Sequence, residues 1–252
     1  MTEKLPYIIA FVCVCLAGCE PMPFASIVQF DIQYLQHPID CKTSISNNDR
    51  QWQINQFNWF VSDIEIQQQG QWRPLTLQVS DRQTESVALL MLDDCQQRSV
   101  SSRQLVLSET IDWRKGQRIR FNLGIPFAAN HANPLRQPSP LNLPFMFWSW
   151  QGGHKFLRLD LQSELGSWSF HLGSTGCQAD SAMRSPVTAC QQPNLFQFEI
   201  PVSTTGHIVM QLDALLAGVE LAKSNSCTFH YAEQPVCQLL IDHLPQMFAN
   251  TD

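Results

Sequence analysis

The sequence predicts an all-β fold: an antiparallel β-sandwich or barrel, stapled by disulfides, with one or two short helices near the C-terminus. Short segments in which apolar and polar residues alternate recur from about residue 28 to residue 211, and this period of two is typical of half-buried strands. Helical periodicity occurs only in the C-terminal part. Strands and helices do not alternate along the chain, as they would in a parallel α/β fold.

The strands follow one another with little interruption. The first covers residues 28–34, and a second covers residues 57–66. Within the second, the apolar alternation slips by one residue, and a β-bulge near Ser62 and Asp63 would explain the slip. The same alternation predicts further strands at residues 75–79, 119–123, 157–161, 168–172, 195–201 and 206–211.

Two helices are predicted after the last strand. Leu212, Leu215, Leu216 and Val219 recur at the i, i+3, i+4 and i+7 positions of one helical face. A second, shorter helix is expected over about residues 236–244, where Pro245 should end it.

The N-terminus has the pattern of an export signal. An apolar run over residues 5–16 leads into Leu16-Ala17-Gly18-Cys19, and it is shorter than the roughly 20 residues that span a bilayer. This ending resembles the bacterial lipobox, whose cysteine is diacylated. We therefore predict a lipoprotein signal peptide at 1–18, lipidation of Cys19, a tether over 19–26 and one domain over 27–252. An ordinary signal peptide cut elsewhere, or a short membrane anchor, is the alternative.

Localisation and charge limit the classes of partner. Glu20 rather than Asp follows the predicted lipidated cysteine, so we expect a lipid-anchored protein on the periplasmic side, in the outer membrane. The chain of 252 residues has a formal net charge of −6 and no basic stripe, which argues against nucleic-acid binding. Its 44% hydrophobic residues are enough to bury a core.

The cysteine count agrees with export. Of nine cysteines, Cys13 and Cys15 leave with the signal peptide and Cys19 carries lipid. An even number remains, which in an oxidising compartment indicates three disulfides. Two pairs close short loops, and the expected bridges are Cys41–Cys95, Cys177–Cys190 and Cys227–Cys237. A thiolate metal site is the competing interpretation, but the sequence has no Cys-x-x-Cys pair.

The motifs of common enzymes are missing from the sequence. It contains no G-x-S-x-G, H-E-x-x-H, G-x-x-x-x-G-K-[ST] or strand-linked G-x-G-x-x-G. Serine, histidine and aspartate occur without a spacing that marks a catalytic triad. The sequence therefore favours a binding domain over an enzyme.

An aromatic segment in the middle of the chain has a distinctive composition. Trp148 and Trp150 form a W-x-W pair, and on a strand both indoles would point to one face because side chains alternate. Such rings are most often core or wall residues, since aromatic side chains dominate protein cores. The pair alone therefore does not identify a site.

The surrounding residues resemble a known family. "IPFAANHANP", "SPLNLPFMFWSWQGGHKFLRLDL", "FHLGSTGC" and "CQQPN", with "FVSD" as a weaker match, are similar to the MbnP-like family of W-x-W, four-cysteine proteins. The resemblance runs from about residue 27 to residue 244. It implies a periplasmic β-protein that binds copper and is produced with a di-haem partner resembling MauG and cytochrome c peroxidase. That partner oxidises a tryptophan to kynurenine, and the modification supports copper binding.

The resemblance also suggests site residues. Trp148 and Trp150 are the candidates for oxidation, and His131 and His171 are the first candidate copper ligands, since imidazole nitrogen suits copper. His131 is expected in a loop and His171 on a strand, opposite the face of Trp168, Phe170 and Leu172. The remaining histidines, His37, His207, His230 and His243, and the remaining tryptophans, Trp52, Trp59, Trp72, Trp113 and Trp168, are expected to be structural or solvated.

His154 is a weak third candidate. If Gly152 and Gly153 formed a two-residue hairpin turn, Gln151 would face His154 and Trp150 would face Lys155. His154 would then project from the face opposite both indoles, away from the altered ring.

Two other functions remain compatible with the residues. The protein could be a lipid-anchored adhesion or ligand-binding protein that uses the β scaffold without metal. It could also be a redox or hydrolytic enzyme whose site the sequence spacing does not reveal.

Overall fold

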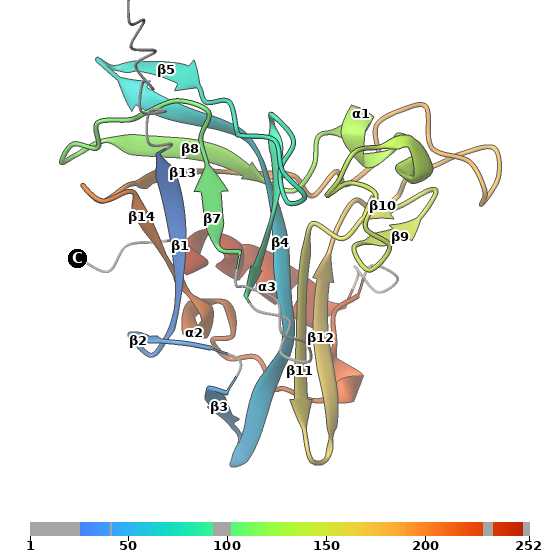
Figure 1. Ribbon diagram of the computed structural model, residues 1–252. Helices are drawn as coiled ribbons and strands as arrows, with labels where there is room; N and C mark the ends of the chain where they lie inside the picture. The colour runs from blue at the N-terminus through green and yellow to red at the C-terminus, as the bar shows by residue number, and fades with distance from the viewer. Residues whose placement is uncertain (1–25, 41, 93–101, 229–233, 249–252) are drawn as a thin grey trace, which may run out of the picture.

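The computed structural model describes residues 26–40, 42–92, 102–228 and 234–248. The predicted signal peptide, Cys19 and the Cys41–Cys95 pair lie outside the described residues. The described strands form two main sheets and a separate two-stranded hairpin, as Figure 1 shows. The all-β prediction is therefore confirmed.

The first sheet is built around the N-terminal strand. β1 (Ile27–Tyr34) pairs antiparallel with β2 (His37–Pro38) and β7 (Gln104–Val106). On its other side it pairs in parallel with β14 (His207–Gln211). This parallel pair differs from the predicted antiparallel arrangement, and it is possible because about two-thirds of the chain lies between the two strands.

The second sheet is organised by one long strand. β4 (Arg50–Gln68) pairs antiparallel with five other strands along its length. These strands are β3 (Ser44–Asn47), β5 (Gln71–Pro74), β6 (Val87–Leu92), β8 (Arg118–Leu123) and β11 (Leu157–Ser163). β12 (Gly166–Leu172) adds to β11, and β13 (Phe196–Pro201) adds to β8. The described part of the sheet is open at both ends, which favours the sandwich over the barrel.

Aromatic side chains connect the two sheets. Phe30 of β1 is fully buried, and its ring lies 6.2 Å from that of Trp59 on β4 and 5.7 Å from that of Phe121 on β8. Trp52, Trp59 and Trp168 are also buried in the core, as expected for packing tryptophans. Burial of such rings is the main favourable contribution to joining the layers.

The predicted bulge is present in β4. The register between β4 and β8 shifts between Ser62 and Glu65, and Asp63 has a φ of 50°. A residue with positive φ is a common feature of bulges, and aspartate tolerates this conformation better than most residues.

The predicted strand at 75–79 is not formed. β5 ends at Pro74, and Val79 is 63% exposed although Leu75 and Leu77 are buried. Backbone pairing with residues 106–108 is limited to an isolated bridge between Leu77 and Leu107, because the Gln83 side chain interrupts the ladder beside it. The Gln83 amide donates to the carbonyls of Gln78 and Val106 at 2.7 and 3.0 Å and accepts from the Val106 N–H at 2.9 Å.

The C-terminal helices differ in length from the prediction. α2 (Leu212–Leu215) stops before Val219, and Gly218 turns the chain with a φ of +66°. α3 (Pro235–Met247) continues past Pro245, because a proline in the last turn removes only one late hydrogen bond. No described helix has both the length and the apolar character needed to cross a membrane.

A smaller substructure lies at one end of the sandwich. It contains α1 (Phe127–Asn130), the 3₁₀ turn Pro134–Arg136, and the hairpin of β9 (Phe147–Ser149) and β10 (Gly153–His154). A second 3₁₀ turn, Lys223–Asn225, follows α2 and contacts β12. Figure 1 shows α1, this hairpin and the loop that leads from β12 to β13 on the same side of the molecule.

Candidate metal centre

A buried asparagine holds this substructure together. Asn130, the last residue of α1, is 1% exposed. Its Oδ1 accepts a hydrogen bond of 2.8 Å from the backbone N–H of His154, and its Nδ2 lies 3.4 Å from Ser174 Oγ. Asn130 therefore ties α1 to the hairpin and to the loop after β12.

The hairpin carries the two candidate tryptophans in different settings. Ser149 pairs with Gly153 and Phe147 pairs with His154, so residues 150–152 form the loop. Gly152 and Gly153 therefore do not form the two-residue turn considered for His154. Trp148 lies in β9 whereas Trp150 lies in the loop, so the two indoles do not share a regular strand face. Both residues are half-buried.

His131 is buried beside Asn130 and a disulfide. Its Nε2 lies 3.2 Å from Asn130 Nδ2 and 3.5 Å from Cys190 Sγ. Because Asn130 Oδ1 is fixed by the His154 N–H, Asn130 must present its amide donor to His131, and Nε2 therefore carries the lone pair. His131 Nδ1 is buried and has no hydrogen-bond partner among the described residues.

The environment keeps this imidazole neutral. Burial, with a smaller contribution from the charge of nearby His154, lowers the pKa of His131 from 6.5 to about 4. A metal binds the neutral form of histidine. His131 thus fits the role of a metal ligand, and it lies in the loop directly after α1, as expected.

His154 is placed differently. It is fully buried, its Nε2 lies 2.8 Å from the Leu141 carbonyl oxygen, and its Nδ1 lies 3.3 Å from the Asn130 carbonyl oxygen. Its ring also packs edge-on against Phe147 at 5.4 Å. Burial lowers the pKa of His154. Since both ring nitrogens face backbone oxygens, this arrangement favours a packing role.

His171 belongs to a polar network on the outer face of β11 and β12. It lies opposite the buried Trp168 and Phe170, as the alternation predicts. Its Nε2 is 2.7 Å from Asp160 Oδ1. When Nε2–H donates to this carboxylate, Nδ1 retains the lone pair, which is the usual arrangement behind a metal-bound histidine.

Asp160 is held as a carboxylate by several donors. It accepts hydrogen bonds of 2.7 Å from Ser169 Oγ and from Arg158 Nε in addition to His171. Burial alone would raise the pKa of Asp160, but the hydrogen bonds and charges of these neighbours hold it well below its usual range.

Two basic side chains connect this network to the aromatic hairpin. Lys155 Nζ and Arg158 Nη1 lie 3.2 and 3.3 Å from the carbonyl oxygen of Phe145, which precedes β9. Burial, with the charge of Arg158 as a second cause, lowers the pKa of Lys155. Asn130 therefore connects His131 to the hairpin, and Arg158 connects the His171 network to the same hairpin.

The expected short-loop disulfides are present, and one of them adjoins His131. Cys177 is bonded to Cys190 and Cys227 is bonded to Cys237. The ligand atoms of His131, Cys177 and Cys190 all lie within 4.8 Å of one another. In the disulfide form these sulfurs are not thiolates, so this group offers one imidazole as a strong ligand.

The remaining predicted residues lie outside the site. His207 contacts Asp31 at 2.6 Å, His243 contacts the Leu215 carbonyl, and His37 is exposed, while His230 is outside the described residues. Asn130, Arg158 and Asp160 were not predicted as site residues. The alternation at 157–161 could have indicated the last two, because it places them on the face of the sheet that carries His171.

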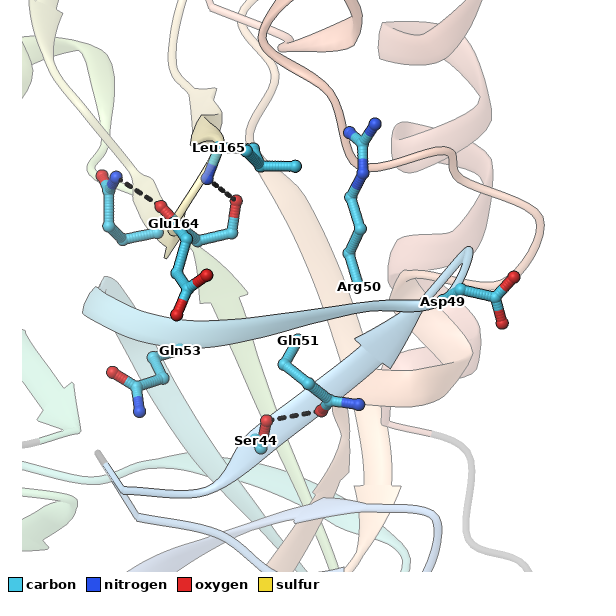
Figure 2. A pocket seen from close by; sticks show the side chains of 9 residues that line it. Ser44, Asp49, Arg50, Gln51, Gln53, Glu164 and Leu165 are labelled. Atoms are coloured by element: carbon cyan, nitrogen blue, oxygen red, sulfur yellow. Dashed lines mark hydrogen bonds between the residues drawn. The ribbon is translucent and has the colours of Figure 1, made fainter.

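A separate cavity of about 640 Å³ lies between the tips of the β3–β4 and β11–β12 hairpins. Figure 2 shows its polar lining, with the Arg50 and Asp49 side chains pointing in different directions. Its lining contains no histidine, cysteine or tryptophan; the residues are Ser44, Asp49, Arg50, Gln51, Gln53, Gln162, Ser163, Glu164 and Leu165. This cavity is therefore distinct from the candidate metal centre.

The fold and the site define a disulfide-bonded β-sandwich protein with histidine side chains close to an aromatic hairpin. The family model for MbnP matches residues 26–229, most of the chain, and the protein belongs to the MbnP family. MbnP from Methylosinus trichosporium has a similar structure, with a TM-score of 0.72, 19% sequence identity and 86% of each chain covered. At this identity the similarity establishes the fold. No curated protein matched the chain.

Proposed function

We propose that this protein is a periplasmic, lipid-anchored copper-binding protein. His131 and His171 supply imidazole ligands, and a di-haem partner resembling MauG and cytochrome c peroxidase oxidises a tryptophan of the W-x-W segment to kynurenine to complete the site. The proposal rests on the hydrogen bonds of the two histidine rings. Asn130 at His131 and Asp160 at His171 each select the tautomer in which one ring nitrogen is unprotonated. Both histidines are also connected to the same hairpin.

The donor set suits copper. Imidazole nitrogen is a good copper ligand, and a buried neutral imidazole loses no proton on binding. His131 meets this condition because burial depresses its pKa to about 4. At His171, the carboxylate of Asp160 fixes the tautomer and raises the basicity of the free nitrogen.

The hairpin supplies the group to be modified. Oxidative opening of the indole pyrrole ring creates an aniline nitrogen and a ketone, both potential metal donors where the indole offered none. Trp148 and Trp150 are half-buried, and the hairpin lies outside both main sheets. A change in ring shape there would disturb the packed core less than oxidation of the buried Trp59 or Trp168.

The location follows from the N-terminus. Cys19 would carry the lipid, and residues 19–26 would tether the domain to the membrane on the periplasmic side. One diacylglycerol with an added amide-linked chain is enough for stable anchoring. The protein itself performs no catalysis in this proposal.

The test compares histidine variants produced together with the di-haem partner. Wild-type protein is expected to retain about one copper ion per chain, and His131→Ala and His171→Ala are expected to lose most of it. His207→Ala is the matched control, because His207 is exposed and pairs with Asp31 away from the hairpin. Copper content after gel filtration is the measurement. Full copper loading of both site variants would contradict the proposal.

The cavity shown in Figure 2 favours a second candidate function, a lipid-anchored ligand-binding protein without metal. Its amide and charged groups could hydrogen-bond a polar ligand. Intact tryptophans, no copper uptake and retained binding of a partner by His131→Ala would support this function instead.

A further inference from the structure

The Cys177–Cys190 disulfide lies next to the imidazole of His131. Cys190 Sγ is 3.5 Å from His131 Nε2, and the ligand atoms of all three residues lie within 4.8 Å of one another. No other group of three histidine, cysteine, aspartate or glutamate ligand atoms is as closely gathered in the part of the chain that the structure describes. This group of three ligand atoms distinguishes the Cys177–Cys190 disulfide from Cys227–Cys237.

The bonded sulfurs are poor metal ligands, but the free thiolates would be strong ones. Thiolate is a soft ligand that selects Cu(I), and imidazole is compatible with the same ion. Cys190 is 5% exposed and His131 is 8% exposed, so a metal held there would be shielded from water on that side.

We infer that reduction of the Cys177–Cys190 disulfide creates a Cu(I) site with two thiolates and the His131 imidazole as ligands. This inference goes beyond the proposed function, because the site needs neither kynurenine nor His171. His131 would belong to both sites, so the redox state of the disulfide would decide which donors accompany it.

The reducing step is a thiol–disulfide exchange. A thiolate of a dithiol oxidoreductase attacks Sγ of Cys177, which is more exposed than Cys190, and the S–S bond breaks with Cys190 leaving as a thiolate. The second thiol of the oxidoreductase then releases Cys177 and closes its own disulfide. Two electrons and two protons pass to the cysteine pair, and Cu(I) binding releases the two protons again.

The local fold can accommodate the separation of the sulfurs. Residues 178–189 contain no helix or strand and are mostly exposed. The base of this loop is held independently, because Thr175 and Gln192 exchange backbone hydrogen bonds of 2.9 and 3.1 Å. Opening the disulfide therefore leaves the loop attached at the β12 and β13 sides.

The test measures Cu(I) binding by protein produced without the di-haem partner, before and after reduction with a water-soluble phosphine. Competition with bicinchoninate under anaerobic conditions reports the affinity, and X-ray absorption reports sulfur ligation. Reduced wild-type protein is expected to bind about one additional Cu(I) per chain, with sulfur scattering. His131→Ala is expected to weaken this binding at least about tenfold.

Paired cysteine variants separate this site from other thiols. Cys177→Ser/Cys190→Ser should abolish the additional binding, whereas Cys227→Ser/Cys237→Ser should retain it. A Trp148→Phe/Trp150→Phe variant should also retain it, although it would remove the proposed kynurenine-dependent site. Equal Cu(I) binding by reduced wild type and by Cys177→Ser/Cys190→Ser would overturn the inference. So would loss of the β-sheet circular dichroism spectrum when wild-type protein is reduced.

Discussion

At the residue scale, the position of the aromatic hairpin depends on the contact between Asn130 and Gly153. Asn130 Oδ1 accepts from the N–H of His154, the residue after Gly153. A Cβ atom at Gly153 would overlap the Asn130 carboxamide, and Gly153 has a φ of +73°. Glycine is therefore required for space as well as for backbone conformation.

Gly153→Ala should consequently destabilise the protein more than a matched alanine substitution elsewhere. Gly70 has a similar φ of +78° but an open surrounding, so Gly70→Ala should cost only the backbone strain, about 1–2 kcal/mol. Gly153→Ala should cost about 3–4 kcal/mol, because the Asn130 network must also shift. Urea unfolding of both variants measures the difference. Equal losses would show that the Asn130 contact does not fix the hairpin.

Burial of His131 should make the folding stability of the metal-free protein depend on pH. Its pKa is about 4 in the folded state, against 6.5 for an unperturbed histidine. The unfolded state therefore binds more protons as the pH falls, and folding stability is lost between about pH 6.5 and pH 4. His154, whose pKa is also lowered by burial, acts in the same direction.

His131→Gln should reduce this acid sensitivity. The free energy of unfolding, measured at about pH 7 and about pH 4.5, should fall less in the variant than in the wild type, because glutamine does not take up a proton. An unchanged difference between the two pH values would contradict the burial of a neutral imidazole at this position.

At the scale of secondary structure elements, two adjacent strands build the His171 network. Antiparallel pairing of β11 and β12 puts Asp160 opposite Ser169 and Arg158 opposite His171. The period of two then places all four side chains on the outer face. The tautomer of His171 is thus determined by residues of the neighbouring strand.

Asp160→Asn should weaken copper binding without unfolding the protein. An amide cannot supply the negative charge that supports the His171 ligand, and loss of such a partner typically costs about 10–100-fold in metal affinity. Asp112→Asn is the control, since Asp112 forms an exposed ion pair with Arg114. The measurement is copper affinity by chelator competition on protein matured by the partner. Equal affinities of the two variants would exclude His171 as a ligand.

The sequence predicted strands in which apolar and polar residues alternate clearly, and it missed strands without this alternation. The alternation at 157–161 and 168–172 indicated the right faces for β11 and β12. β6 (Val87–Leu92) was not predicted, because every one of its residues is buried and no alternation remains. The strand expected at 75–79 is reduced to an isolated bridge between Leu77 and Leu107, because the Gln83 side chain interrupts the backbone ladder there.

At the scale of the whole molecule, the candidate site is assembled from segments that local patterns cannot bring together. His131 follows α1, the tryptophans lie around β9, His171 lies in β12, and Cys190 lies in the loop before β13. The family resemblance predicted His131, His171 and the tryptophans. The contacts of Asn130 with His154 and Ser174 join segments that are far apart in the chain, and periodicity alone carries no information about which loop meets which.

The sandwich also explains why the modification is expected at the hairpin. Trp52, Trp59 and Trp168 are packed inside the sheets, whereas β9 and β10 form a small sheet of their own beside α1. A half-buried indole there can be altered while the two main sheets retain their contacts.

Peptide mass spectrometry of protein isolated from cells that also produce the di-haem partner is the sharpest test of kynurenine formation. The peptide containing Trp148 and Trp150 is expected to have lost one carbon and gained one oxygen on a single indole, and this form should carry copper. All other tryptophan peptides should have their unmodified mass. Copper bound at full occupancy by protein in which both indoles are intact would contradict the account.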